Sequence, residues 1–144
     1  MVDELSFEVP RHECGPSLSR TAVGDRFAGH VSARVLDDLR VIVSELTTNA
    51  LLYGTGEIHL RVLLDDGLVS GEVIDEGSGV ERAVAERGID AVGGNGLHLV
   101  GALTRRWGIH EGTSHVWFEL APGGEPRPVD PRLGAERRPD ALDD

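Results

Sequence analysis

The chain contains no lysine and a single cysteine, and each of these scarcities limits the classes of protein to which it can belong. All 14 basic residues are arginine, against 25 acidic ones, so the net charge is −11. An acidic chain is a poor ligand for nucleic acid or for an anionic membrane, and we expect neither as a partner. Without lysine, an anionic ligand must be neutralised by arginine, backbone amides or a metal ion.

The scarcity of cysteine and the absence of long apolar runs exclude further classes of protein. The single cysteine, Cys14, excludes an intrachain disulfide and is typical of a reducing compartment. The first ten residues lack the basic start and apolar run of a signal peptide. No apolar run approaches the roughly 20 residues that span a bilayer. We therefore expect a cytoplasmic protein.

The composition changes after Leu120. The residues that follow hold five of the seven prolines and few large apolar side chains. Such a segment cannot offset the entropy cost of becoming ordered. We therefore expect a domain over residues 1–120, followed by a disordered, acidic and proline-rich tail over residues 121–144.

The apolar pattern predicts an α+β fold with a mostly antiparallel sheet. Alternating apolar residues indicate strands, and apolar residues at helical spacing indicate helices. The expected strands are 5–9, 58–64, 68–74, 109–111 and 115–120, and the expected helices are 17–28, 33–53 and 97–107. Residues 80–94 are expected to be irregular. Hairpin connections, with a turn at 65–67, favour antiparallel pairing over regular strand–helix alternation.

A carboxylate and an amide lie one turn apart in the long predicted helix. Glu45 and Asn49, within "SELTTNALLYG", fall on the shoulder of its apolar stripe, with Cβ atoms about 5–6 Å apart. Half-buried polar groups of this kind need partners. The pair taken alone is more typical of a surface glutamate and an asparagine bonded to nearby backbone than of a functional site.

Two glycine-rich segments follow in the chain. In "VIDEGSGV", Asp75 ends a strand and can accept a hydrogen bond, while Gly77 and Gly79 let a flat ligand approach. In "GGNGLHLV", Gly94 and Gly96 lead into a helix whose free N–H groups favour an anion. Each segment alone also fits an ordinary turn or loop.

The three motifs in this order resemble the N, G1 and G2 boxes of the GHKL, or histidine kinase-like, ATP-binding superfamily. The likeness is closer to its small stand-alone anti-sigma-factor serine/threonine kinases and covers roughly residues 5–120. It is carried by the segments "VIVSELTTNA", "GLHLVGALTRRWGI" and "VWFEL". The resemblance implies a Bergerat-type fold, a two-layer sandwich of a mixed, mostly antiparallel sheet with helices on one face. It also implies ATP and Mg²⁺ as ligands, a sigma factor and/or an anti-anti-sigma antagonist as partner, and a homodimer.

The resemblance also implies a role for each motif residue. Glu45 is the general base, Asn49 binds ATP through Mg²⁺, and Asp75 accepts a hydrogen bond from the adenine amino group. The other ATP-binding residues implied are Gly77, Gly79, Gly94, Asn95, Gly96, Leu97 and Thr113. Arg20, in "SLSRTAV", is implied as a contact to the protein partner.

The chain departs from the pattern at the end of the long helix. Many relatives have a basic residue and a histidine there, where this chain has Leu52 and Tyr53. Mg²⁺, a helix N-terminus and an arginine such as Arg82 or Arg87 must then neutralise the phosphates. Two other functions stay open: a module that binds ATP without transferring phosphate, and a structural domain with a degenerate site. The intact motifs weigh against the second, and Glu45 favours a kinase over the first.

Overall fold

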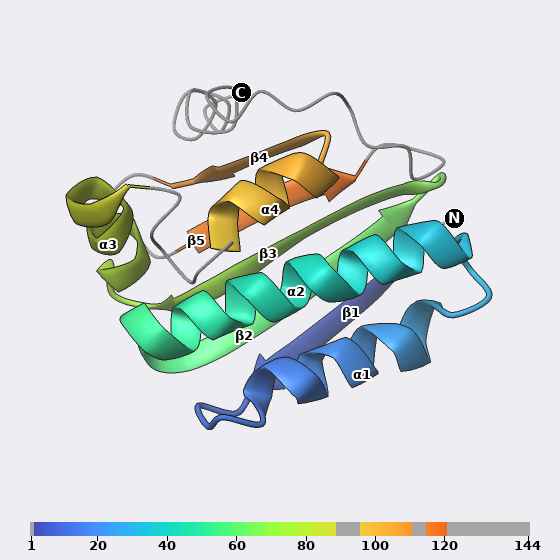
Figure 1. Ribbon diagram of the computed structural model, residues 1–144. Coiled ribbons are helices and arrows are strands. Elements are labelled where there is room, and N and C mark those ends of the chain that lie inside the picture. Colours follow the sequence, from blue (N-terminus) through green and yellow to red (C-terminus); the bar gives the residue numbers. More distant parts are fainter. Residues whose placement is uncertain (1, 89–95, 111–114, 121–144) are drawn as a thin grey trace.

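The computed structural model describes residues 2–88, 96–110 and 115–120, which form one sheet and its covering helices (Figure 1). The elements, in chain order, are β1 (Val2–Val9), α1 (Gly15–Phe27), α2 (Ala33–Tyr53), β2 (Thr55–Asp65), β3 (Leu68–Glu76), α3 (Gly79–Arg87), α4 (Gly96–Leu103), β4 (Arg106–Ile109) and β5 (His115–Leu120). The tail expected over residues 121–144 lies outside the described residues. None of the described helices is long and apolar enough to cross a membrane.

The sheet has the strand order β1-β2-β3-β5-β4. Every pairing between the described strands is antiparallel, which confirms the expected mostly antiparallel sheet without the parallel pairing of a mixed one. A tight turn at Asp66 and Gly67, both with positive φ, joins β2 to β3 and confirms the predicted hairpin.

The helices α1, α2 and α4 cover one face of this sheet, which confirms the two-layer α+β architecture (Figure 1). The helix α2 has the predicted bounds, and its first turn is capped by Ser32, whose side chain accepts a hydrogen bond from the Val35 N–H at 3.1 Å. Its apolar stripe packs on the inward residues of the strands. The core at this contact contains Leu39, Ile42, Val43, Leu46, Ile58, Leu60 and Val62.

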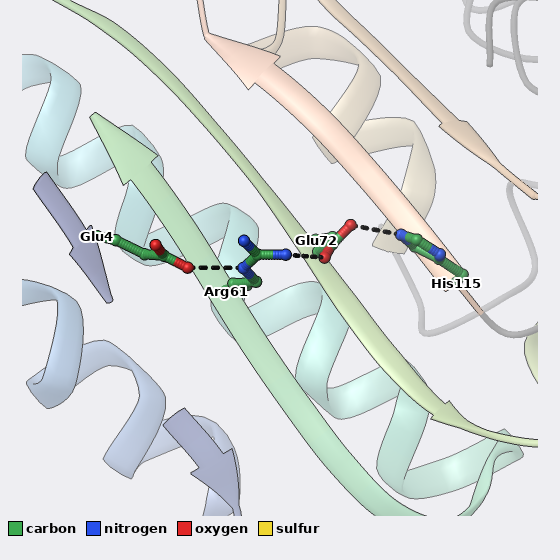
Figure 2. Close-up of polar contacts among 4 residues, drawn as sticks. All are labelled: Glu4, Arg61, Glu72 and His115. Atoms are coloured by element: carbon green, nitrogen blue, oxygen red, sulfur yellow. Dashed lines mark hydrogen bonds and ion pairs between the residues drawn. The ribbon is translucent and has the colours of Figure 1, made fainter. Parts of the chain in front are cut away.

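The opposite face of the sheet carries a row of ionic side chains from β1, β2, β3 and β5 (Figure 2). Arg61 donates to Glu4 at 2.7 Å and lies 3.5 Å from Glu72, which in turn is 2.6 Å from His115 Nε2. The hydrogen bond from His115 lowers the pKa of Glu72, against the opposing effect of burial. The row therefore links strands that are distant in sequence.

Two predicted elements are wrong. Residues 80–94 were expected to be irregular, but Gly79–Arg87 is a helix that buries Val80, Ala83 and Val84 on one side. The helix expected to reach Trp107 ends at Leu103. Trp107 instead lies in β4, paired with Phe118 of β5 and fully buried. Both differences arise because contacts with distant segments decide the conformation of short stretches.

Candidate functional site

The last turns of α2 meet the end of β3 and the start of α3 at one end of the sheet (Figure 1). Asn49 lies here, with 1% of its surface exposed. Neither its Oδ1 nor its Nδ2 has a hydrogen-bond partner among the described residues. A buried polar group without a partner costs about 1–3 kcal/mol. The amide of Asn49 is therefore suited to a ligand that supplies the partner.

Asp75, at the end of β3, lies beside the C-terminus of α2. It is 7% exposed, and its carboxylate packs against the α carbon of Gly54. A Cβ on Gly54 would overlap that carboxylate and would lie 2.7 Å from the Ala50 carbonyl oxygen. The φ of Gly54 is −90°, so this position requires glycine for space and not for backbone freedom.

The two glycines after Asp75 turn the chain back toward α2. Gly77 has a φ of +115°, which favours glycine. A Cβ on Gly79 would overlap the carbonyl oxygen of Tyr53. The predicted motif therefore forms a turn that packs the start of α3 closely against the end of α2.

Glu45 lies one turn before Asn49 and is half-buried. Burial raises its pKa above the ordinary value of 4.5. A raised pKa makes the carboxylate a better proton acceptor near neutral pH, which suits a general base.

The second glycine-rich segment is described in part. Gly96 begins α4, and Leu97 is fully buried in the core, so any contact of Leu97 with a phosphate is through its backbone. Three of the predicted ATP-binding residues, Gly94, Asn95 and Thr113, lie outside the described residues.

Arg20, the predicted partner contact, bridges two helices. It is half-buried on α1, and its Nη1 donates to the Ser44 hydroxyl of α2 at 2.6 Å. Since Ser44 precedes Glu45, the arginine supports the helix beside the site.

Sequence reasoning missed two contacts at this end of the sheet. Arg11 donates to backbone carbonyls at the end of α2 and at the start of β2, and no motif indicated this. The guanidinium of Arg87 lies 5.5 Å from the centre of the Tyr53 ring. A cation over an aromatic face is attracted to it, so this candidate phosphate partner also ties α3 to α2.

The donors present fit Mg²⁺ carried in with a nucleotide. Within the described residues, no group of three or more His, Cys, Asp or Glu side chains could hold a metal ion. Mg²⁺ commonly uses one or two protein oxygens and completes its shell with phosphate oxygens and water. The buried amide of Asn49 offers one such oxygen, and Asp75 offers an acceptor for an amino group.

Fold and site together define a nucleotide-binding domain. A family model for the histidine kinase-like ATPase domain matches residues 20–120. Because this match covers more than half of the chain, the protein belongs to the histidine kinase-like ATPase domain family. It is accordingly an ATP-binding protein with a regulatory role. No curated protein matches the chain.

Proposed function

We propose that the protein is a serine/threonine kinase of the anti-sigma type, which binds a sigma factor and/or phosphorylates an antagonist protein on serine. One observation carries the proposal. Glu45, whose pKa is raised by burial, lies one helical turn from the buried amide of Asn49. A base next to a metal-binding amide is the arrangement that phosphoryl transfer to a hydroxyl requires.

Each site residue has a separate role in the proposed site. Asn49 Oδ1 binds Mg²⁺, and the Asp75 carboxylate accepts a hydrogen bond from the adenine amino group. The N-terminus of α4 offers backbone N–H groups to the phosphates. Mg²⁺, when bound, offsets negative charge on the phosphate oxygens, which matters in a chain without lysine.

In the proposed reaction, a serine oxygen of the partner attacks the γ-phosphorus of ATP, and the serine proton passes to the Glu45 carboxylate. The new O–P bond forms as the bond from the γ-phosphorus to the bridging oxygen breaks. The products are phosphoserine on the partner and ADP.

A second function, ATP-dependent binding without phosphotransfer, is favoured by the end of α2. Leu52, where many relatives carry a basic residue, is 61% exposed. The last turn of α2, which is described in full, therefore carries no cation of its own to offset phosphate charge, which favours holding ATP over transferring its phosphate. Glu45 distinguishes the two functions, because only the kinase needs it as a base.

Two measurements test the proposal. Calorimetry measures the binding of Mg²⁺-ATP, and a phosphotransfer assay uses a partner protein purified from the native cells. Wild type should bind Mg²⁺-ATP, Asn49→Ala should bind it more weakly, and Glu45→Ala should bind it but transfer no phosphate. Asp75→Asn should lose about tenfold to a hundredfold in affinity, since a charged hydrogen bond contributes about 1.5–3 kcal/mol. Glu45→Ala that transfers phosphate as fast as wild type would remove the kinase mechanism.

The charge of the domain indicates the kind of partner. Residues 1–120 carry 19 acidic and 10 basic side chains. We infer a basic protein partner, such as a sigma factor, which meets DNA through basic surfaces. Association between opposite charges slows as salt rises, because the Debye length falls from about 10 Å at 0.1 M to about 3 Å at 1 M. An association rate that is independent of salt, or a partner as acidic as this chain, would overturn the proposal of a basic partner.

Sedimentation of the chain alone tests whether it forms the proposed homodimer.

A further inference from the structure

We infer that Arg11 is a positioning residue of the nucleotide site, which holds the end of α2 and its connection to β2 where Gly54 meets Asp75. The inference rests on the proposed ATP site. Arg11 lies between β1 and α1, far in sequence from Asn49 and Asp75, and its hydrogen bonds go to backbone carbonyls of α2 and β2 rather than to these side chains.

The guanidinium of Arg11 binds both sides of the α2–β2 connection. Its Nε donates to the carbonyl oxygen of Gly56 at 2.7 Å, and its Nη1 donates to those of Ala50 at 3.1 Å and Leu51 at 3.2 Å. Gly54 lies between these acceptors. One side chain therefore ties the last turn of the helix to the start of the strand.

Electrostatics explains why a cation is needed at this place. The last carbonyl groups of a helix lack partners within the helix and carry partial negative charge. The last turn of α2, all of it within the described residues, contains no basic residue. Arg11 supplies the missing positive charge from another segment. Arginine suits the position because its planar fork can bind several oxygens at once, whereas lysine is a point charge.

The backbone around Arg11 is itself held by local contacts. The His12 N–H donates to the Pro10 carbonyl, and the Gly15 N–H donates to the His12 carbonyl, both at 2.8 Å. A Cβ on Gly15 would lie 2.5 Å from the Pro10 oxygen. This compact turn holds the backbone of the arginine beside α2, so less backbone entropy remains to be lost when the bonds form.

The segment held by Arg11 contains the contact that shapes the site. The Gly54 N–H donates to the Ala50 carbonyl at 2.9 Å, the same oxygen that accepts from Arg11. Gly54 is packed on the Asp75 carboxylate, and Asn49 directly precedes Ala50. If this turn loosens, Gly54 and Ala50 move. The side chains of Asp75 and Asn49, which lie next to them, are then no longer held in place for the ligand.

The test compares Arg11→Gln and Arg11→Lys with Arg26→Gln, a surface arginine on α1 that pairs with Asp3 at 2.7 Å. Mg²⁺-ATP affinity is measured well below the melting temperature, where every variant is folded. We expect about a threefold to tenfold loss for Arg11→Gln, from the strength of charge–helix interactions. Arg11→Lys should lie between Arg11→Gln and wild type, and Arg26→Gln should match wild type.

Hydrogen exchange of the Gly54 amide gives a readout that does not depend on nucleotide. Exchange should be faster in Arg11→Gln than in Arg26→Gln, because the Ala50 carbonyl loses its second donor. Unchanged ATP affinity in folded Arg11→Gln, or unchanged Gly54 exchange, would overturn the inference. If wild type binds no ATP, the proposed function fails, and Gly54 exchange alone then decides whether Arg11 holds this turn. If Arg11→Gln does not fold, Arg11→Lys with wild-type affinity and exchange would overturn the inference.

Discussion

The carboxylate of Asp75 lies directly against the α carbon of Gly54, in space that any larger residue at position 54 would fill. The two residues are on different elements, α2's C-terminal cap and the end of β3. Gly54 therefore does more than end a helix. It sets the place of the acceptor proposed to recognise adenine.

Gly54→Ala should displace the Asp75 carboxylate and weaken Mg²⁺-ATP binding by at least about tenfold, since the charged hydrogen bond to adenine loses its geometry. Calorimetry measures the loss. Gly67→Ala is the control, because Gly67 has open space around it but a positive φ, in the β2–β3 turn. It should reduce thermal stability through backbone strain and leave ATP affinity unchanged. Equal ATP affinity of Gly54→Ala and wild type would contradict the assignment.

Glu45→Gln should abolish phosphotransfer and stabilise the fold near neutral pH. The folded-state pKa of Glu45 lies above its unfolded value because of burial. Its contribution to stability is thus fully present below about pH 4.5 and is lost as pH rises through the raised pKa. Glutamine removes this loss of stability. The melting temperature of the variant should therefore be higher than that of wild type at pH 7 but not at low pH.

Asp38→Asn is the matched control for Glu45→Gln. Asp38 lies on the same helix, and burial, opposed by attraction to Arg34, raises its pKa as well. Its replacement should shift the pH dependence of melting in the same direction while phosphotransfer stays at the wild-type rate. A loss of phosphotransfer in Asp38→Asn would mean that charge on α2, rather than a base at Glu45, supports the reaction.

Glu72→Gln should destabilise the fold near neutral pH, because Glu72 joins Arg61 and His115 across the open face of the sheet (Figure 2). The hydrogen bond from His115 lowers its pKa below the ordinary 4.5. This stabilisation is present above about pH 4.5 and is lost as pH falls through the lowered pKa. Thermal melting against pH should show the two proteins converging in acid.

His115→Gln provides the companion test on the same pair. A double-mutant cycle with Glu72→Gln should show an interaction free energy between the two residues, because they share one short contact. Additive losses in stability would show that the contact contributes nothing of its own.

Deletion of residues 122–144 should change neither the melting temperature nor ATP affinity, because this segment has few large apolar side chains with which to pack. Differential scanning calorimetry and ATP titration of the shortened chain measure both. A fall of several degrees in melting temperature would mean that the segment packs on the domain.

The sequence by itself determined the elements whose signals are local. The long helix 33–53 was predicted with its observed bounds, because its apolar stripe is regular and Gly54 ends it. The β2–β3 hairpin followed from alternation on both sides of an Asp-Asp-Gly turn. Asn49, Asp75 and the glycines around them were singled out because their motifs, in that chain order, resemble those of the histidine kinase-like ATP-binding superfamily. The structure then placed Asn49 and Asp75 at one end of the sheet, both buried.

Only the tertiary structure decided the features that depend on partners distant in the chain. Trp107 fits a helix by its spacing, but pairing with Phe118 and full burial make it part of a strand. The helix α3 is too short and polar to be indicated by pattern, and forms where Gly79 packs on the end of α2. The contacts of Arg11 carry no local signal at all. In each case burial and hydrogen bonding between distant segments outweigh the weak conformational preferences of a few neighbouring residues. Such long-range contacts cannot be predicted from the local sequence.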